Sequence, residues 1–227
     1  MKGIDISHWQ GKSFFNKLHS LQKQIGADIE FVIMKATEGR TYVDPMFHEY
    51  MKEVKDRNLL AGAYHFARPD NGNSAEEEAA NFVTTIRPYL NDALLLALDW
   101  EGEAAKKSSE DWVLAWCNTV YDLTGIKPLV YCSISNVNRL PSVAAKNYGL
   151  WVARWTSAGT PGIIAPWKIW AIWQYTNTPV DIDIFNGNKI QWLKYCTASK
   201  KPVVTPEEGI CHCGCDYCCD NKQEQSI

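Results

Sequence analysis

The chain has 227 residues, of which 46% are hydrophobic and 22% are charged, and its formal net charge is −3 at pH 7. This length suits one large domain with a short appendage, and the composition is that of an ordinary globular protein. The charge is not basic enough to indicate nucleic-acid binding, and no nucleic-acid-binding motif is present. The sequence contains no apolar run of about 18 residues, so it predicts no membrane-spanning helix. The first residues also lack the apolar core of a secretory signal peptide, so we expect no export by the usual secretory route.

Apolar segments in chain order predict the eight strands of a largely parallel barrel. The segment at residues 94–98 is a near-continuous apolar run, as expected for a strand that is covered on both faces. The predicted strands are residues 3–7, 31–35, 59–66, 94–98, 129–131, 150–153, 169–173 and 180–185.

Helix signals separate the early strands. Asp44 is a candidate N-cap that precedes an amphipathic segment, and Ser74 with Glu77 forms a capping box. Ser108 resembles a third helix start, and Gly125 is a candidate C-cap for the helix that follows it. These signals predict helices between the strands of the first part of the barrel.

The later strands lack such helices. Residues 156–166 are rich in Gly, Pro and small residues, and only residues 176–179 separate Tyr175 from Val180. Because a parallel crossover needs about a dozen residues or more, the last two strands must pair antiparallel or connect irregularly. We therefore predict an α/β fold, an incomplete barrel at residues 1–196. A linker at 197–210 and a cysteine-rich tail at 211–227 follow it.

Two acidic residues end the fourth predicted strand. Asp99 and Glu101 stand at positions i and i+2, so strand alternation places both on one face, with Trp100 opposite. In a parallel barrel the carboxyl ends of the strands hold the active site, which favours acid–base chemistry here. The alternative is that the strand emerges into water and its acids are solvated.

Acids also occur in the first and last predicted strands. Asp5 interrupts an apolar strand, and Asp181 and Asp183 alternate along another. A buried carboxylate is costly unless it is paired or functional. Asp5 could instead cap a turn, and Asp183 could form a salt bridge at the rim. In a closed barrel the first and last strands are neighbours, so these acids would converge.

Several motifs resemble glycoside hydrolase family 25, in the family's order and from residue 3 to about 186. They are GIDISHWQG at residues 3–11, FVIMKATEG at 31–39, GAYHF at 62–66 with Arg68-Pro69, LDWE at 98–101, LWVAR at 150–154, WQYT at 173–176 and Val180-Asp181. The resemblance implies a muramidase that cleaves the β-1,4 bond after N-acetylmuramic acid in peptidoglycan glycan strands. It also implies a TIM-like barrel with five β/α units followed by three further strands.

The resemblance assigns roles to single residues. Glu101 matches the family's general acid, and Asp99 matches its acidic partner. Asp5 and Asp181 match the acids of the first and last strands, whereas Asp183 stands where the family often has Asn. We expect the substrate to contact Tyr64, His65, Arg68, Trp100, Tyr131, Trp155, Trp173 and Gln174.

Two of these residues, His65 and Trp155, are expected to behave differently from the others. His65 is expected to donate a hydrogen bond to a carboxylate or to the substrate. Trp155 stands where the family frequently has Tyr, so we expect its stacking on sugar rings to differ from that of the family.

Three catalytic routes are consistent with the Asp-Trp-Glu spacing. Residues i and i+2 on a strand lie about 6.6 Å apart along the chain. Direct nucleophilic retention needs carboxyl groups about 5–5.5 Å apart, and inversion needs about 6.5–9.5 Å. In the third route the 2-acetamido group of the substrate attacks its own anomeric carbon while Asp99 orients the N–H. We favour this route.

Two rival functions come from other classes. A non-catalytic glycan-binding module would need the barrel and its aromatic residues but not the acids. A zinc amidase that cuts the peptide stem would need a His-Glu-x-x-His pattern or paired histidines, and the sequence has neither. The products of digested peptidoglycan would distinguish these functions. New reducing sugar ends would indicate a glycosidase, and new free amines would indicate an amidase. If neither product formed, the protein would be a glycan-binding module.

The C-terminal tail differs from the barrel in its high cysteine content. It contains five cysteines and one histidine within nine residues. One interpretation is a zinc site formed by Cys211, Cys213, Cys215 and Cys218, since Cys-x-x-Cys spacing can bind zinc. The others are disulfides that form after release, or a tail that docks to the wall or has no defined role. We expect no cofactor for catalysis, no metal in the barrel, and a monomer stored in the host cytoplasm until lysis releases it to the wall.

Overall fold

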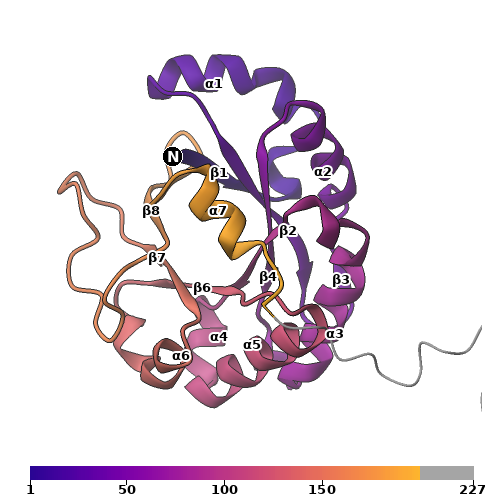
Figure 1. Ribbon diagram of the computed structural model, residues 1–227, viewed down its shortest axis with the longest axis vertical. Coiled ribbons are helices and arrows are strands. Elements are labelled where there is room, and N and C mark those ends of the chain that lie inside the picture. Colours follow the sequence, from indigo (N-terminus) through magenta and orange to yellow (C-terminus); the bar gives the residue numbers. More distant parts are fainter. Residues whose placement is uncertain (200–227) are drawn as a thin grey trace, which may run out of the picture.

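The computed structural model describes residues 1–199, and eight strands of this part form a closed barrel (Figure 1). Neighbouring strands in the ring are hydrogen-bonded, and pairing of the first strand with the second closes it. The ring runs β1 (Lys2–Ile6), β9 (Asp181–Phe185), β8 (Ile172–Thr176), β7 (Gly149–Ala153), β6 (Leu129–Ser133), β5 (Leu95–Asp99), β4 (Leu60–Phe66) and β2 (Phe31–Glu38). The short strand β3 (Tyr42–Val43), which was not predicted, pairs antiparallel with the carboxyl end of β2.

Of the two alternatives predicted for the last strands, antiparallel pairing is the one observed. The strand β9 pairs antiparallel with both β8 and β1, whereas the other ring pairs are parallel. The position of β8 was predicted wrongly, because it begins at Ile172 and not at residue 169. Ile169 is 64% exposed, so this apolar residue lies in the loop before the strand.

Helices cover the outside of the first part of the ring, as predicted (Figure 1). No helix occurs between β7 and β8, in keeping with the Gly- and Pro-rich sequence of that segment. The helices of residues 1–199 are α1 (Leu18–Ile25), α2 (Phe47–Asp56), α3 (Ala75–Ile86), α4 (Gly102–Lys107), α5 (Glu110–Thr124), α6 (Pro141–Ala145) and α7 (Lys189–Tyr195).

The structure confirms two of the helix signals. Ser74 and Glu77 form the predicted capping box at the start of α3. Gly125 ends α5 in the left-handed conformation, at φ 73°, which glycine adopts without steric cost.

Two other helix starts were predicted wrongly. Asp44 precedes α2, where its carboxylate accepts hydrogen bonds from the backbone N–H groups of Met46 and His8 and so stabilises a turn. Ser108 lies before α5, and its hydroxyl accepts from Trp100 Nε1 and donates to Ala104 O, which closes the unpredicted helix α4.

A second unpredicted helix, α7, lies across the ring of strands (Figure 1). Its Trp192 is fully buried and packs on Phe31 and Phe185, with ring centroids 4.8 Å and 5.2 Å away. Phe31 begins β2 and Phe185 ends the antiparallel strand β9, so both lie at the amino end of the parallel strands. The helix therefore closes one end of the barrel and leaves the carboxyl end of the strands free for a site.

The remaining predicted segments lie at the C-terminus. Residues 197–199 of the expected linker are described, and the backbone N–H of Ser199 donates to Gly125 O at 2.8 Å. Residues 200–227, including the four cysteines that one interpretation assigns to a zinc site, lie outside the described residues. The zinc site therefore stays a prediction.

Candidate active site

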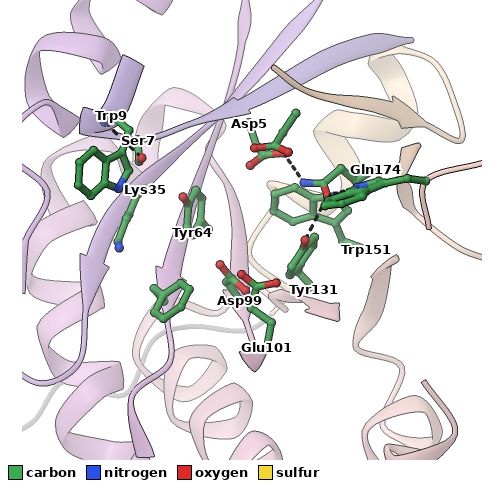
Figure 2. A pocket seen from close by; sticks show the side chains of 13 residues that line it. Asp5, Ser7, Trp9, Lys35, Tyr64, Asp99, Glu101, Tyr131, Trp151 and Gln174 are labelled. Atoms are coloured by element: carbon green, nitrogen blue, oxygen red, sulfur yellow. Dashed lines mark hydrogen bonds between the residues drawn. The ribbon is translucent and has the colours of Figure 1, made fainter. Parts of the chain in front are cut away.

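Four carboxyl groups lie in one pocket at the carboxyl end of the barrel (Figure 2). Asp99 is the last residue of β5, and Glu101 follows two residues later. Asp5 comes from β1, and Asp181 is the first residue of β9. Because β9 is antiparallel, its first residue lies at the same end of the barrel as the last residue of a parallel strand. The pocket is lined by Asp5, Ser7, Trp9, Lys35, Tyr64, Phe66, Asp99, Glu101, Tyr131, Trp151, Trp155, Gln174 and Asp181.

The turn after β5 positions Glu101. The backbone N–H of Trp100 donates to Tyr131 O at 3.0 Å, which continues the β5–β6 pairing by one residue. Glu101 is extended, and Gly102 then takes a left-handed conformation, at φ 55°, that favours glycine. The Glu101 side chain therefore returns to the same side as Asp99, and Figure 2 shows the two carboxyl groups next to each other.

Burial and mutual repulsion keep protons on these acids. Burial raises the pKa of Asp99 well above its usual range, the nearby charge of Glu101 adds to this, and Lys35 offsets a part. Burial also raises the pKa of Glu101, and the charge of Asp181 contributes. The pKa of Asp181 is raised by burial. These carboxyl groups therefore keep their protons to a higher pH than free carboxyl groups do, which suits them to proton donation.

Gln174 links one wall of the pocket to its rim (Figure 2). Its Nε2 donates to Asp5 Oδ2 at 2.8 Å, while its Oε1 accepts from the Tyr131 hydroxyl and from Trp155 Nε1, both at 3.1 Å. Trp155 is 59% exposed, so most of its ring is accessible to a sugar. Tyr131, Trp155 and Gln174 thus lie where we expected substrate-binding residues, as does Tyr64.

Comparison with known proteins agrees with this geometry. The model of glycosyl hydrolases family 25 matches residues 4–184. The chain belongs to glycosyl hydrolase family 25. It is 29% identical to Lysozyme M1 of Streptomyces globisporus over 215 residues, which cover 85% of this chain and 70% of that protein.

Solved structures show the same fold. The family GH25 lysozyme from Aspergillus fumigatus superposes with a TM-score of 0.72 at 29% identity, and the match covers 86% of this chain and 98% of that one. The CTP1L endolysin gives a TM-score of 0.67 at 26% identity, over 85% of this chain and 69% of that one. The family resemblance and the incomplete TIM-like barrel predicted from the sequence are therefore confirmed.

Three aromatic residues expected at the substrate do not line the pocket of this family 25 chain. His65, Trp100 and Trp173 each adjoin a pocket residue, and strand alternation turns them to the opposite side, towards the helices and loops. Trp100 Nε1 donates to Ser108, and Trp173 Nε1 donates to Arg154 O. The structure therefore does not bring these three predicted residues into the pocket.

His65 lies in the protein interior and connects a strand to a helix. It is fully buried, and its ring hydrogen-bonds Thr37 Oγ1 at 2.7 Å and Glu78 Oε2 at 2.8 Å. Burial lowers the pKa of His65, and Glu78 opposes this shift. The expected hydrogen bond to a carboxylate is confirmed, and it joins β4 to α3.

Arg68 also lies outside the pocket. It follows β4 and forms ion pairs with Glu38 at 2.7 Å and Asp70 at 3.1 Å, in a separate polar hollow. Two neighbouring carboxylates hold its guanidinium in that hollow, so its expected contact with substrate stays a prediction.

Sequence reasoning missed five residues that line the pocket: Ser7, Trp9, Lys35, Phe66 and Trp151. Lys35 carried a usable signal, because it alternates with apolar residues in β2 and so faces the barrel interior. Its Nζ donates to Glu38 at 2.6 Å and lies 4.7 Å from the centre of the Phe66 ring. Trp9 is 82% exposed at the rim, a position that no sequence pattern indicated.

No helix within residues 1–199 is long and apolar enough to cross a membrane. No group of three or more His, Cys, Asp or Glu side chains in the same part is arranged to hold a metal ion.

The raised carboxyl pKa values predict that stability depends on pH. These groups bind protons more tightly in the native state than in the unfolded chain, so they stabilise the fold at low pH. The stabilisation is lost as pH rises through the native pKa, which is about 7 for the buried Asp183. Each unit of raised pKa corresponds to about 1.4 kcal/mol. We expect the free energy of unfolding, measured with urea, to fall between about pH 5 and pH 8.

The control for this prediction is a matched pair of substitutions. Asp99→Asn removes one buried acid and should flatten the dependence on pH, whereas Asp28→Asn at an exposed position should leave it unchanged. A stability that rises over this range in the wild-type protein would contradict the prediction.

Proposed function

We propose that this chain is a muramidase, a lysozyme that hydrolyses the β-1,4 bond between N-acetylmuramic acid and N-acetylglucosamine in peptidoglycan. The observation that carries the proposal is the neighbouring pair Asp99 and Glu101, whose pKa values are both raised, in a pocket lined by aromatic side chains. The likeness to Lysozyme M1 and to the Aspergillus fumigatus lysozyme supports this choice of substrate.

Glu101 suits the role of general acid. Its raised pKa keeps a proton available near neutral pH, and its position after the strand brings that proton to the open side of the pocket. Protonation of the leaving oxygen lowers the barrier because the departing sugar then leaves as a neutral alcohol.

Asp99 suits the role of substrate orienter. Asp99 lines the pocket, and its buried Oδ1 has no hydrogen-bond partner among the described residues, so its carboxyl group retains acceptor capacity for a donor that the substrate brings into the pocket. The acetamido N–H of N-acetylmuramic acid is such a donor. Donation to Asp99 favours its charged form and therefore leaves the proton of the coupled pair on Glu101. Substrate binding would thus prepare the general acid.

The acetamido oxygen would then attack the anomeric carbon of its own sugar. Substrate-assisted enzymes of this kind are known exceptions to the rule that relates carboxyl separation to stereochemistry. Water later opens the cyclic intermediate with Glu101 as the base, and the product keeps the β configuration. Direct nucleophilic attack by Asp99 would also retain the configuration, whereas inversion would give an α product.

The rival functions differ in their products. A glycan-binding module releases no new ends from peptidoglycan, an amidase releases free amines, and a muramidase releases reducing N-acetylmuramic acid. Analysis of digested peptidoglycan therefore separates the three classes, and a digest without new reducing ends would overturn the proposal.

The first functional prediction concerns Glu101→Gln. We expect the variant to fold normally and to lose at least about 100-fold in turnover, because an amide cannot donate the required proton. Glu103→Gln is the matched control, since Glu103 is exposed on α4 and pairs with Lys106. Glu103→Gln should clear cell walls at the wild-type rate, and a Glu101→Gln variant that also did so would remove the assignment.

The second functional prediction concerns Asp99. Asp99→Asn should slow the glycosidic step strongly, because an amide orients the acetamido group less well than a carboxylate does. Proton NMR of freshly formed wild-type product should show the β anomer first. An initial α anomer would indicate inversion, with a carboxylate acting as base towards water.

We also propose that the enzyme acts as an endolysin, stored in the host cytoplasm and released to the wall at lysis. The likeness to the CTP1L endolysin supports this proposal. Expression inside a susceptible host should leave the cells intact until a holin-type pore is co-expressed. Active enzyme outside intact, growing cells without such a pore would contradict the proposal.

A further inference from the structure

A fifth carboxyl group, that of Asp183, lies beneath the pocket and has no role in the mechanism above. It is fully buried on β9, and Trp151 Nε1 donates to its Oδ1 at 2.8 Å. Its Oδ2 is also buried but receives no donor from the residues that the structure describes. An unpaired buried carboxylate oxygen is costly, so this atom needs an explanation.

The neighbour of Asp183 is another carboxyl group. Strand pairing places Gly3 opposite Asp183 and Asp5 opposite Asp181, so Asp5 and Asp183 lie diagonally on adjacent strands. Gln174 bonds Asp5 and is also the cross-strand partner of Asp183, so the two carboxyl groups lie around one amide, and each acts on the pKa of the other. Two ionised carboxylates offer four acceptor oxygens and no donor, so this arrangement favours a bound proton.

The hydrogen-bond donors around the two carboxyl groups limit the positions that this proton can occupy. A tryptophan N–H can only donate, so the bond from Trp155 makes Gln174 Oε1 an acceptor and leaves Gln174 Nε2 to donate to Asp5 Oδ2. Trp151 likewise supplies a donor to Asp183 Oδ1. One oxygen of each carboxyl group is thus satisfied, and the place without a donor lies between Asp5 and Asp183.

We propose that Asp5 and Asp183 share a single proton, and that Asp183 is thereby a positioning residue that fixes Asp5, Gln174 and the rim residue Trp155. The pair then carries one negative charge in place of two. This inference does not depend on the muramidase activity, because it concerns the protonation of the free enzyme.

The electrostatic environment agrees with a retained proton. Burial raises the pKa of Asp183 to about 7, against the hydrogen bonds that it receives, and the charge of Asp181 contributes. Burial raises the pKa of Asp5 well above its usual range, helped by the charges of Asp183 and Asp181 and opposed by Gln174. The other titratable groups that interact with the pair or with the pocket acids include Lys35, Glu38, Tyr64, Asp99, Glu101, Tyr131 and Cys132.

The test is an NMR titration of the full chain labelled with ¹³C at the aspartate Cγ. In the wild-type protein we expect Asp5 and Asp183 to give coupled resonances that titrate with a midpoint of about 7 or above. The label leaves Glu101 silent, and an Asp99→Asn background removes the other strongly shifted aspartate of the pocket. Resonances of both residues that are fully ionised at about pH 5.5 would overturn the proposal, since no shared proton would then exist.

The matched variant is Asp183→Asn. Its amide oxygen can still accept from Trp151, and its N–H₂ group can donate to Asp5 in place of the proton. We expect Asp5 to titrate at a lower pH in this variant, by at least about one unit, because its partner is now a neutral donor. An Asp5 titration identical to that of the wild type would contradict the shared proton, and the wild-type titration remains decisive even if the variant fails to fold.

Kinetics distinguish positioning from a merely structural role. We expect Asp183→Asn to keep most of the wild-type kcat near pH 5.5. Above about pH 7 it should lose less activity than the wild type, because it has no shared proton to release. Asp183→Leu provides neither the acceptor nor the donor and should lose kcat at both pH values. If Asn and Leu variants had the same pH profile, Asp183 would not position Asp5 through a proton.

Discussion

Closure of the barrel through an antiparallel strand is the constraint on which the site depends. Residues 177–180 are too few for a helical crossover, so β9 turns back beside β8 and then pairs with β1. This direction brings Asp181 directly opposite Asp5 at the carboxyl end of the parallel strands. With a long connection β9 would run parallel, and its first residue would lie at the closed end, far from Asp99.

Placing several acidic side chains in one buried pocket lowers the stability of the fold, and interactions elsewhere in the barrel offset this loss. Of the described side chains that line the pocket, Lys35 is the sole Lys or Arg among four carboxyl groups. Desolvation and like-charge repulsion are reduced by bound protons and by dedicated donors such as Gln174 and Trp151. At the other end the interior is apolar, as the contacts of Trp192 show. One end of the barrel thus stabilises the fold, and the other holds the chemically useful but unfavourable groups.

The sequence predicts the acids well because two simple rules act together there. Alternation places Asp99 and Glu101 on one face, and the end of a parallel strand places that face at the open end of a barrel. The same alternation, applied to the neighbours of Tyr64 and Gln174, excludes His65 and Trp173 from the pocket, and within β2 it places Lys35 on the face of Phe31 and Ile33. The sequence could therefore have predicted these placements.

Other features could not be read from the sequence. Residues 169–173 are apolar at every position, so no alternation between polar and apolar residues shows where the strand begins. The start of β8 was therefore predicted three residues too early. The helix α7 has a short amphipathic sequence whose burial depends on the barrel that it closes. The proton between Asp5 and Asp183 depends on which strands are adjacent, and the sequence shows only that both residues are acidic.

The closed end of the barrel also determines where the chain leaves it. Ser199 is bound to Gly125, which precedes β6 and so lies on the face opposite the pocket. Polypeptide attached at this point therefore starts at the end of the barrel opposite the pocket. A reporter fused after residue 199 would begin away from the pocket entrance, so this position suits an attachment that has to leave the carboxyl end of the strands open.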